Sequence, residues 1–237
     1  TRAYTALAAL ITLALVVASG DPTPVASIQM SALLPTSPSI KYSFVQVASG
    51  LDFPVYATHA GNDRLFIVEQ KSGKIKVPQG GAVLPTPLLS IPSDITTGNE
   101  EGLIGLAFEP DYANTRRFYV FFAHTSGNNV LRRYTTYITD TNKANPVTAM
   151  SILTVPHTLN DYHLGGWIGF GPDGYLHLTT GDAGEWSACP AQKPTELRGK
   201  VLRLNVVGQV TYTTPAGNIF TTTQRPEVYA MGLRNPW

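Results

Sequence analysis

The stretch Phe118-Tyr119-Val120-Phe121 decides the fold that we predict for this chain. Its residues are aromatic or β-branched, and such residues favour β-strands. Similar runs occupy residues 65–68 and 175–178, and each of the three runs follows a turn-forming segment. A second strand candidate comes after each run, at residues 73–77, 129–134 and 199–204. The sequence therefore repeats one unit of two strands three times.

The period of this repeat predicts an all-β fold of the β-propeller type. When Phe66, Tyr119 and Leu176 are taken as equivalent, the spacings are 53 and 57 residues, and a propeller blade of four strands takes about 50 residues. Blades pack face to face, so each one buries both surfaces only when it has neighbours. No segment after residue 40 sustains a 3.6-residue apolar stripe, which argues against an α/β fold. A β-sandwich is the alternative for an all-β chain.

The end of the chain predicts an incomplete propeller. Residues 226–230 (Pro-Glu-Val-Tyr-Ala) echo residues 54–57 (Pro-Val-Tyr-Ala), so we expect a fourth copy to begin there. About three and a half blades cannot close a ring, because propellers typically have about four to eight blades. We therefore expect residues 41–237 to form part of a propeller domain that continues after Trp237.

The first 40 residues predict a secretory leader followed by a linker. Arg2 precedes an apolar run over residues 3–18, with small residues at 18–20, which is typical of a cleaved signal peptide over residues 1–20. The run is slightly short for a membrane-spanning helix, and an uncleaved membrane anchor is the alternative. Residues 21–40 are rich in Pro, Ser, Thr and Ala, as linkers are. We expect a secreted or periplasmic protein with no stable membrane insertion after cleavage.

Composition excludes several classes of protein. The 17 Lys and Arg residues balance 16 Asp and Glu residues for a net charge of +1, so nothing indicates a nucleic-acid partner. Hydrophobic residues make up 43% of the chain, enough for a sizeable core, and 21 Gly with 18 Pro indicate many turns. Cys189 is the only cysteine, so no disulfide can form within the chain.

An ordered series of motifs narrows the family. The motifs lie at residues 100–108 (EEGLIGLAF), 163–166 (HLGG), 170–176 (FGPDGYL), 181–182 (GD), 199–203 (GKVLR) and 232–237 (GLRNPW). A single Pro-Asp-Gly turn would say almost nothing, but in this order the series resembles the glucose/sorbosone dehydrogenase family over residues 41–237. The resemblance implies a six-bladed β-propeller in the whole protein. It also implies an aldose dehydrogenase that depends on pyrroloquinoline quinone (PQQ).

The resemblance implies roles for five residues of this chain. The family's general base is the histidine that opens the His-Asn-Gly-Gly segment, which matches His163, and histidine exchanges protons near neutral pH. Arg234 and Asn235 match the Arg-Asn-Pro segment, whose side chains reach the quinone oxygens; a fixed guanidinium there stabilises charge developing on the quinone. Glu100 is expected to face the sugar. Gly165 is expected to let cofactor or sugar approach the backbone.

Neighbouring carboxylates leave some of these assignments open. Glu101 competes with Glu100, because alternation along a strand turns only one of two adjacent side chains inward. Asp161 is a candidate to orient the histidine base. Asp182 is interpreted as a turn cap after a strand rather than as half of a metal pair with Glu185.

PQQ and calcium are the cofactors that the resemblance implies. Calcium ligands are expected after residue 237, so no metal ligand is named in this chain. The expected reaction oxidises an aldose at its anomeric carbon to the lactone, with hydride passing to the quinone and His163 as base; the electron acceptor is left open. One alternative is a non-catalytic extracellular propeller that binds carbohydrate or a protein partner. It is favoured by Leu164, which replaces the family's Asn and so is expected to remove a polar contact near the substrate. A calcium-dependent lactonase-type hydrolase fits the motifs less well.

Overall fold

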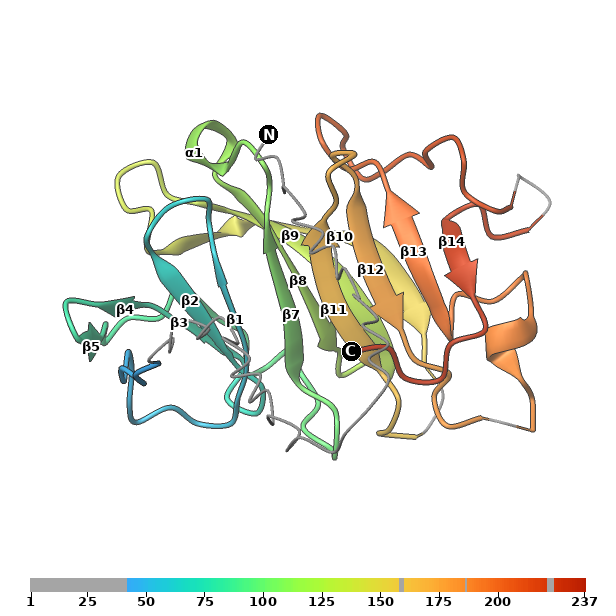
Figure 1. Ribbon diagram of the computed structural model, residues 1–237, viewed down its shortest axis with the longest axis horizontal. Coiled ribbons are helices and arrows are strands. Elements are labelled where there is room, and N and C mark those ends of the chain that lie inside the picture. Colours follow the sequence, from blue (N-terminus) through green and yellow to red (C-terminus); the bar gives the residue numbers. More distant parts are fainter. Residues whose placement is uncertain (1–41, 158–159, 186, 221–223) are drawn as a thin grey trace, which may run out of the picture. The chain divides into compact units, whose positions relative to one another are not determined.

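Three antiparallel sheets of four strands each form the fold of this computed structural model (Figure 1). The structure describes residues 42–157, 160–185, 187–220 and 224–237. The predicted signal peptide (residues 1–20) and linker (residues 21–40) lie outside these ranges. The strands all belong to the unit formed by residues 45–237, and the first begins at Pro54. Within the described ranges, no helix is long and apolar enough to span a membrane.

In each sheet the strands are hydrogen-bonded in chain order. The first sheet consists of β1 (Pro54–His59), β2 (Leu65–Glu69), β3 (Lys74–Lys76) and β6 (Leu89–Ser90). The second consists of β7 (Leu103–Phe108), β8 (Arg117–Ala123), β9 (Asn128–Thr136) and β10 (Ala144–Pro156). The third consists of β11 (Gly165–Phe170), β12 (Leu176–Thr180), β13 (Lys200–Leu204) and β14 (Val228–Met231). The smaller elements are the hairpin of β4 (Pro78–Gln79) and β5 (Ala82–Val83), the one-turn helix α1 (Tyr112–Thr115) and the 3-10 turn η1 (Pro190–Gln192).

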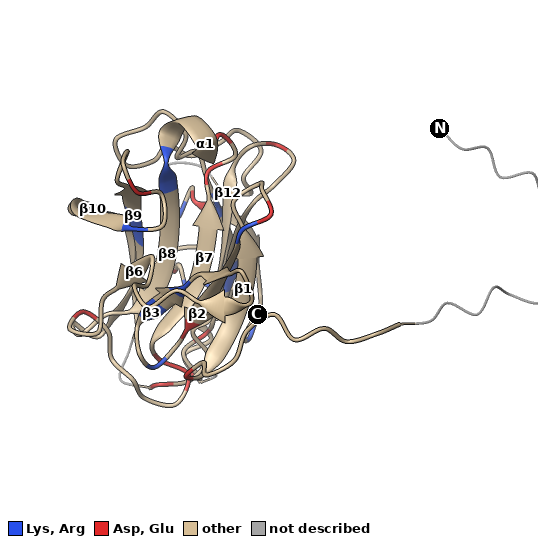
Figure 2. Cartoon of the chain, turned by 90° about the vertical axis from the view of Figure 1, so that its left-hand side faces the viewer, with Lys and Arg blue, Asp and Glu red and all other residues tan. Residues whose placement is uncertain are grey.

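The repeat predicted from the sequence corresponds to these sheets. The three quoted runs fall in the second strands β2, β8 and β12, and the candidates that follow them give the third strands β3, β9 and β13. The all-β propeller fold is therefore confirmed. Figure 2 shows basic and acidic residues interspersed along the chain rather than gathered in one stretch.

The expected start of a fourth blade at residues 226–230 is wrong. β14 pairs with β13, with Lys200 opposite Met231 and Leu202 opposite Val228, so it is the outer strand of the third sheet. The described residues thus form three four-stranded blades rather than three and a half. Period-two alternation is the same in an inner and an outer strand, and the sequence pattern could not distinguish the two positions.

The alternation of β8 explains why the sheets stack. Phe118, Val120 and Phe122 belong to the core shared with the first sheet, whereas Tyr119 and Phe121 belong to the core shared with the third. All five side chains are fully buried. Removing each large apolar side chain from water contributes about 1.5–3 kcal/mol to stability. A sheet that is apolar on both faces needs a neighbour on each side, as predicted for a blade.

Glycines allow the inner strands of neighbouring sheets to approach closely. β7 contacts both β1 and β11. A Cβ atom on Gly105 would lie 2.3 Å from the carbonyl oxygen of Gly166, and a Cβ on Gly166 would lie 2.2 Å from Cγ2 of Ile104. Side chains at these positions would therefore push β7 and β11 apart.

We predict that Gly105→Ala destabilises the protein strongly, because the new methyl group would meet backbone that cannot move aside. The expected loss in the free energy of unfolding of the intact protein is about 3 kcal/mol, measured by urea denaturation. Gly169→Ala is the matched control, since the atoms nearest to its Cβ would be those of the Trp167 ring, at 2.7 Å, and Trp167 is 40% exposed and can turn away. Equal losses in the two variants would contradict the close packing of β7 on β11.

Candidate functional site

His163 lies in the segment that leads into β11, and its backbone is strained. Its φ is 55°, a left-handed conformation that side-chain-bearing residues adopt rarely and at a cost of about 1–3 kcal/mol. Its N–H donates to Oε2 of Glu100 at 2.8 Å, and its carbonyl oxygen accepts from the N–H of Ala183 at 3.2 Å. A Cβ on Gly181 would lie 1.7 Å from that carbonyl oxygen. Glycine at position 181 is therefore required for His163 to sit where it does.

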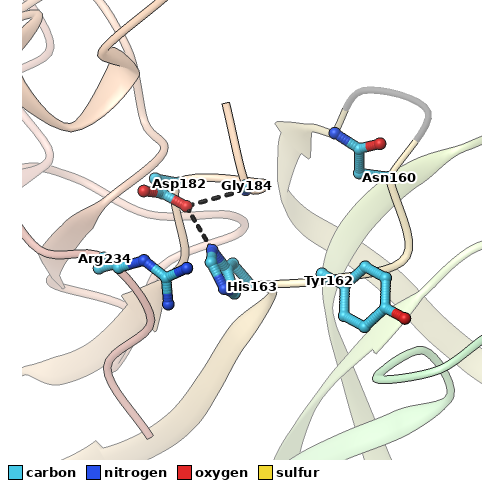
Figure 3. A pocket seen from close by; sticks show the side chains of 6 residues that line it. All are labelled: Asn160, Tyr162, His163, Asp182, Gly184 and Arg234. Carbon is cyan, nitrogen blue, oxygen red and sulfur yellow. Dashed lines mark hydrogen bonds and ion pairs between the residues drawn. The ribbon is translucent and has the colours of Figure 1, made fainter. Parts of the chain in front are cut away.

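The ring of His163 is oriented by Asp182. Its Nδ1 lies 2.8 Å from Oδ1 of Asp182 (Figure 3), and the two side chains are only 13% and 10% exposed. An ionised carboxylate accepts hydrogen bonds but does not donate them, so Nδ1 is the donor, and in the neutral imidazole this arrangement leaves the lone pair on Nε2. Oδ1 of Asp182 also accepts from the N–H of Gly184 at 2.8 Å. Asp182 thus caps the turn, as predicted, and in addition orients His163, which the sequence analysis missed.

Asp161, the candidate for that orienting role, makes other contacts. Its Oδ2 accepts from the backbone N–H of Asn99 at 3.0 Å and from Nδ2 of Asn99 at 2.7 Å. These hydrogen bonds hold the pKa of Asp161 below its usual value. The sequence did contain a signal for Asp182 as the residue that orients His163. The Gly181-Asp182 pair directly follows β12, the strand that pairs with β11.

A cavity of about 540 Å³ opens beside the His163–Asp182 pair and is lined by Asn160, Tyr162, His163, Asp182, Gly184 and Arg234 (Figure 3). The guanidinium of Arg234 extends toward His163 in this view. Arg234 is exposed, and among the described residues its guanidinium has no hydrogen-bond or ion-pair partner. The cavity therefore combines an imidazole that can accept a proton with a cation that is available to a ligand.

Asn235 ties the other predicted residues together. Its Nδ2 donates to Oε2 of Glu100 at 3.2 Å, and its Oδ1 accepts from the N–H of Gly165 at 2.9 Å. Because the same Glu100 oxygen accepts from His163, these four residues form one hydrogen-bonded cluster. Arg234 is the neighbour of Asn235 in the chain, so the structure brings all five predicted residues together.

The five residues do not all face the same cavity. A second cavity, of about 260 Å³, is lined by Val55, Gln70, Asn99, Glu100, Gly165, Asn235 and Trp237. Glu100 and Gly165 thus line this second cavity, whereas His163 and Arg234 line the first. The alternative Glu101 uses its Oε2 to accept from the N–H of Gly98 at 2.8 Å, within its own loop.

Two further positions contribute to packing. A Cβ on Gly165 would lie 2.8 Å from the carbonyl oxygen of Thr179, so β12 approaches this glycine closely. Leu164 is buried against Ile104 and Ala123. The replacement of the family's Asn at position 164 therefore adds to the core in this chain.

Irregular pairing marks the start of every inner strand. Register shifts occur between Pro54 and Tyr56 in β1, between Leu103 and Gly105 in β7, and between Gly165 and Ile168 in β11. Such β-bulges redirect side chains and are frequent next to active sites. In the described part of the chain, no group of three or more His, Cys, Asp or Glu side chains is arranged to hold a metal ion.

Comparisons with known proteins agree with the motif series. The glucose/sorbosone dehydrogenase family model matches residues 51–237. Human Hedgehog-interacting protein is 35% identical over 216 residues, which cover 81% of this chain and 30% of that protein. Quinoprotein glucose dehydrogenase B of Acinetobacter calcoaceticus is 27% identical, over 80% of this chain and 44% of the enzyme.

A solved structure supports the fold. The aldose sugar dehydrogenase of Streptomyces coelicolor, in its PQQ-bound form, has a TM-score of 0.67 and 27% identity, over 80% of this chain and 53% of that chain. The chain thus spans between about a third and about half of the length of these proteins. Since the family model covers well over half of the chain, the chain belongs to the glucose/sorbosone dehydrogenase family.

Proposed function

We propose that the intact protein oxidises an aldose at its anomeric carbon to the lactone, with PQQ as the hydride acceptor. The observation that carries this proposal is the 2.8 Å hydrogen bond between Nδ1 of His163 and Asp182, in a cavity that also holds the guanidinium of Arg234, which is unpaired among the residues that the structure describes. The named activities of two family relatives, a quinoprotein glucose dehydrogenase and an aldose sugar dehydrogenase, support it.

His163 would act as the general base. Nε2 would accept the proton of the anomeric hydroxyl while the hydride leaves the anomeric carbon, so that the C–O single bond becomes the carbonyl of the lactone. Asp182 would stabilise the imidazolium that forms and would keep the ring in the tautomer that has a free Nε2. Glu100 and Asn235 would keep the backbone of His163 and the Arg234 segment in place through the hydrogen-bonded cluster.

The residues of the cavity fit PQQ, which supplies the hydride-accepting quinone when bound. PQQ is planar and carries carboxylate groups and quinone oxygens, and a guanidinium binds such oxygens with paired N–H donors. Arg234 has those donors available, whereas the amide of Asn235 is already engaged by Glu100 and Gly165. Arg234 would therefore contact the cofactor, and Asn235 would hold the segment that presents it. Calcium remains part of the proposal, with its ligands expected after residue 237.

A protein-binding role is the second candidate. The 35% identity with Hedgehog-interacting protein, which is named for a protein partner, favours a non-catalytic propeller. The same chain could carry either role, because folds accommodate unrelated functions and the chemistry resides in the site. Secretion through residues 1–20 is proposed for both candidates.

We predict that the intact protein, reconstituted with PQQ and calcium, oxidises one or more aldoses with a dye as electron acceptor. His163→Ala should lower kcat by about 10²–10⁴-fold, the usual contribution of a positioned base, while PQQ affinity changes little. A kcat of His163→Ala equal to that of the wild type would contradict the assignment of His163 as the base. Failure of the wild type with every aldose would favour the binding role.

We predict that Asp182→Asn lowers kcat by about 10²–10⁴-fold, because the amide can donate to Nδ1 and so favour the tautomer with its proton on Nε2. Asp173→Asn is the matched control: Asp173 also pairs with a histidine, His177, at 4.0 Å, but away from the cavity. The kcat values of the two variants, measured by steady-state kinetics, should differ by at least tenfold. An Asp182→Asn enzyme as active as the control would show that Asp182 has no part in the reaction.

We predict that Arg234→Ala weakens PQQ binding and lowers turnover, because the guanidinium charge acts both before and during hydride transfer. PQQ titration followed by absorbance would measure the change in PQQ affinity. Kinetics at saturating PQQ would measure the change in turnover. Arg225→Ala serves as the control, since the Nε of Arg225 donates to the carbonyl of Thr195 in a loop outside the cavity. Unchanged PQQ affinity in Arg234→Ala would contradict the assigned contact.

A further inference from the structure

The ammonium of Lys71 contacts four backbone carbonyl groups. Lys71 follows β2, and its Nζ donates to four of the five carbonyls of residues 97–101, here called the Glu100 loop, which leads into β7. Its acceptors are the carbonyl oxygens of Thr97 at 3.5 Å, Asn99 at 2.8 Å, Glu101 at 3.0 Å and, in a short contact, Gly98. The remaining carbonyl of the loop, that of Glu100, accepts from Nε2 of the adjacent Gln70 at 2.7 Å. Each of the five carbonyls of the loop therefore accepts a hydrogen bond from one of two neighbouring side chains, Lys71 or Gln70.

This arrangement is the one that a monovalent cation prefers. An ammonium group has three N–H donors, fewer than the four carbonyl oxygens that it contacts, so its charge as well as its hydrogen bonds attracts these oxygens. Rings of backbone carbonyls bind potassium in the same manner. Lys71 thus supplies a cation that is attached to the chain.

The amide groups of the Glu100 loop are held from the other side. The N–H of Gly98 donates to Oε2 of Glu101 at 2.8 Å, and those of Asn99 and Glu100 donate to Oδ2 and to the carbonyl of Asp161, both at 3.0 Å. A Cβ on Gly98 would lie 2.7 Å from Oε2 of Glu101 and 2.8 Å from Asp161. Two carboxylates thus flank the loop, and the Lys71 charge adds to the Asn99 hydrogen bonds that lower the pKa of Asp161.

We propose that Lys71 is a positioning residue of the site, whose ammonium replaces a monovalent cation and holds the Glu100 loop in place. The loop then places Oε2 of Glu100 against the N–H of His163 and the Nδ2 of Asn235. Without the ammonium, the four carbonyl groups would lose their shared donor and would turn toward water. Glu100 would then no longer hold His163 at its strained φ of 55°. The effect on the reaction rests on the proposed function, whereas the effect on the loop rests on the contacts alone.

The test is the intact Lys71→Ala protein with and without propylammonium, which restores an ammonium on a short apolar chain. Hydrogen exchange of the amides of Gly98, Asn99 and Glu100 reports the loop, since they donate to Glu101 and Asp161, and that of Leu103 reports its junction with β7, since it donates to the carbonyl of Gln70. Tetramethylammonium is the matched cation, because it has the charge but no N–H donors. Lys76→Ala is the control variant: Lys76 is a half-buried lysine on β3 whose ammonium, within the described residues, has no hydrogen-bond partner.

We expect exchange of these four amides to rise at least tenfold in Lys71→Ala, with strands β8 and β9 unchanged. Propylammonium should return the exchange rates to those of the wild type, and tetramethylammonium should not. The kcat for aldose should fall about tenfold and recover with the same amine. Unchanged exchange, or exchange that rises without rescue by the amine, would overturn the proposal. Rescued exchange with an unaffected kcat would overturn the link to the site. A wild type inactive with all aldoses, but with rescued loop exchange, would overturn only the proposed reaction.

Discussion

The second sheet is apolar on both faces, and the rest of the structure depends on this constraint. Phe118, Val120 and Phe122 of β8 face one neighbour, and Tyr119 and Phe121 face the other, all of them fully buried. Such a sheet is stable only between two others, because either face left in water would forfeit its hydrophobic stabilisation. The stacking in turn places the inner strands β1, β7 and β11 next to one another, which no single sheet could do.

The site is formed where these inner strands begin. The segments before β7 and β11 and the segment after β14 supply Glu100, His163 and Asn235, which are far apart in the sequence. Glycines 105, 166 and 181 let backbone approach backbone, and Glu100 and Asp182 then hold His163 by its N–H and its ring. The candidate site therefore depends on contacts between blades.

Lysine ammonium groups stabilise the irregular segments around the site. Lys71 binds the carbonyls of the Glu100 loop, and the fully buried Lys200 donates to the carbonyls of Pro190, Ala191 and Arg198 at 2.8, 3.0 and 2.7 Å. Burial lowers the pKa of Lys200 to about 8, since desolvation disfavours its charge. Carbonyl groups outside sheets need donors when they are buried, and a single lysine provides several.

The repeat of runs such as Phe118-Tyr119-Val120-Phe121 was enough to predict the all-β blades, and the family resemblance of the motif series implied His163, Glu100, Gly165, Arg234 and Asn235 as candidate site residues. Those signals are local, because alternation and motif order are properties of one strand or one loop. The tertiary structure was needed to show that β14 ends the third blade, that Asp182 rather than Asp161 pairs with His163, and that Lys71 donates to carbonyls of the Glu100 loop. Each of these three contacts depends on which strands lie side by side, within one sheet or in neighbouring sheets. Pairing between distant segments is decided by packing of the whole domain, so no local pattern could reveal it.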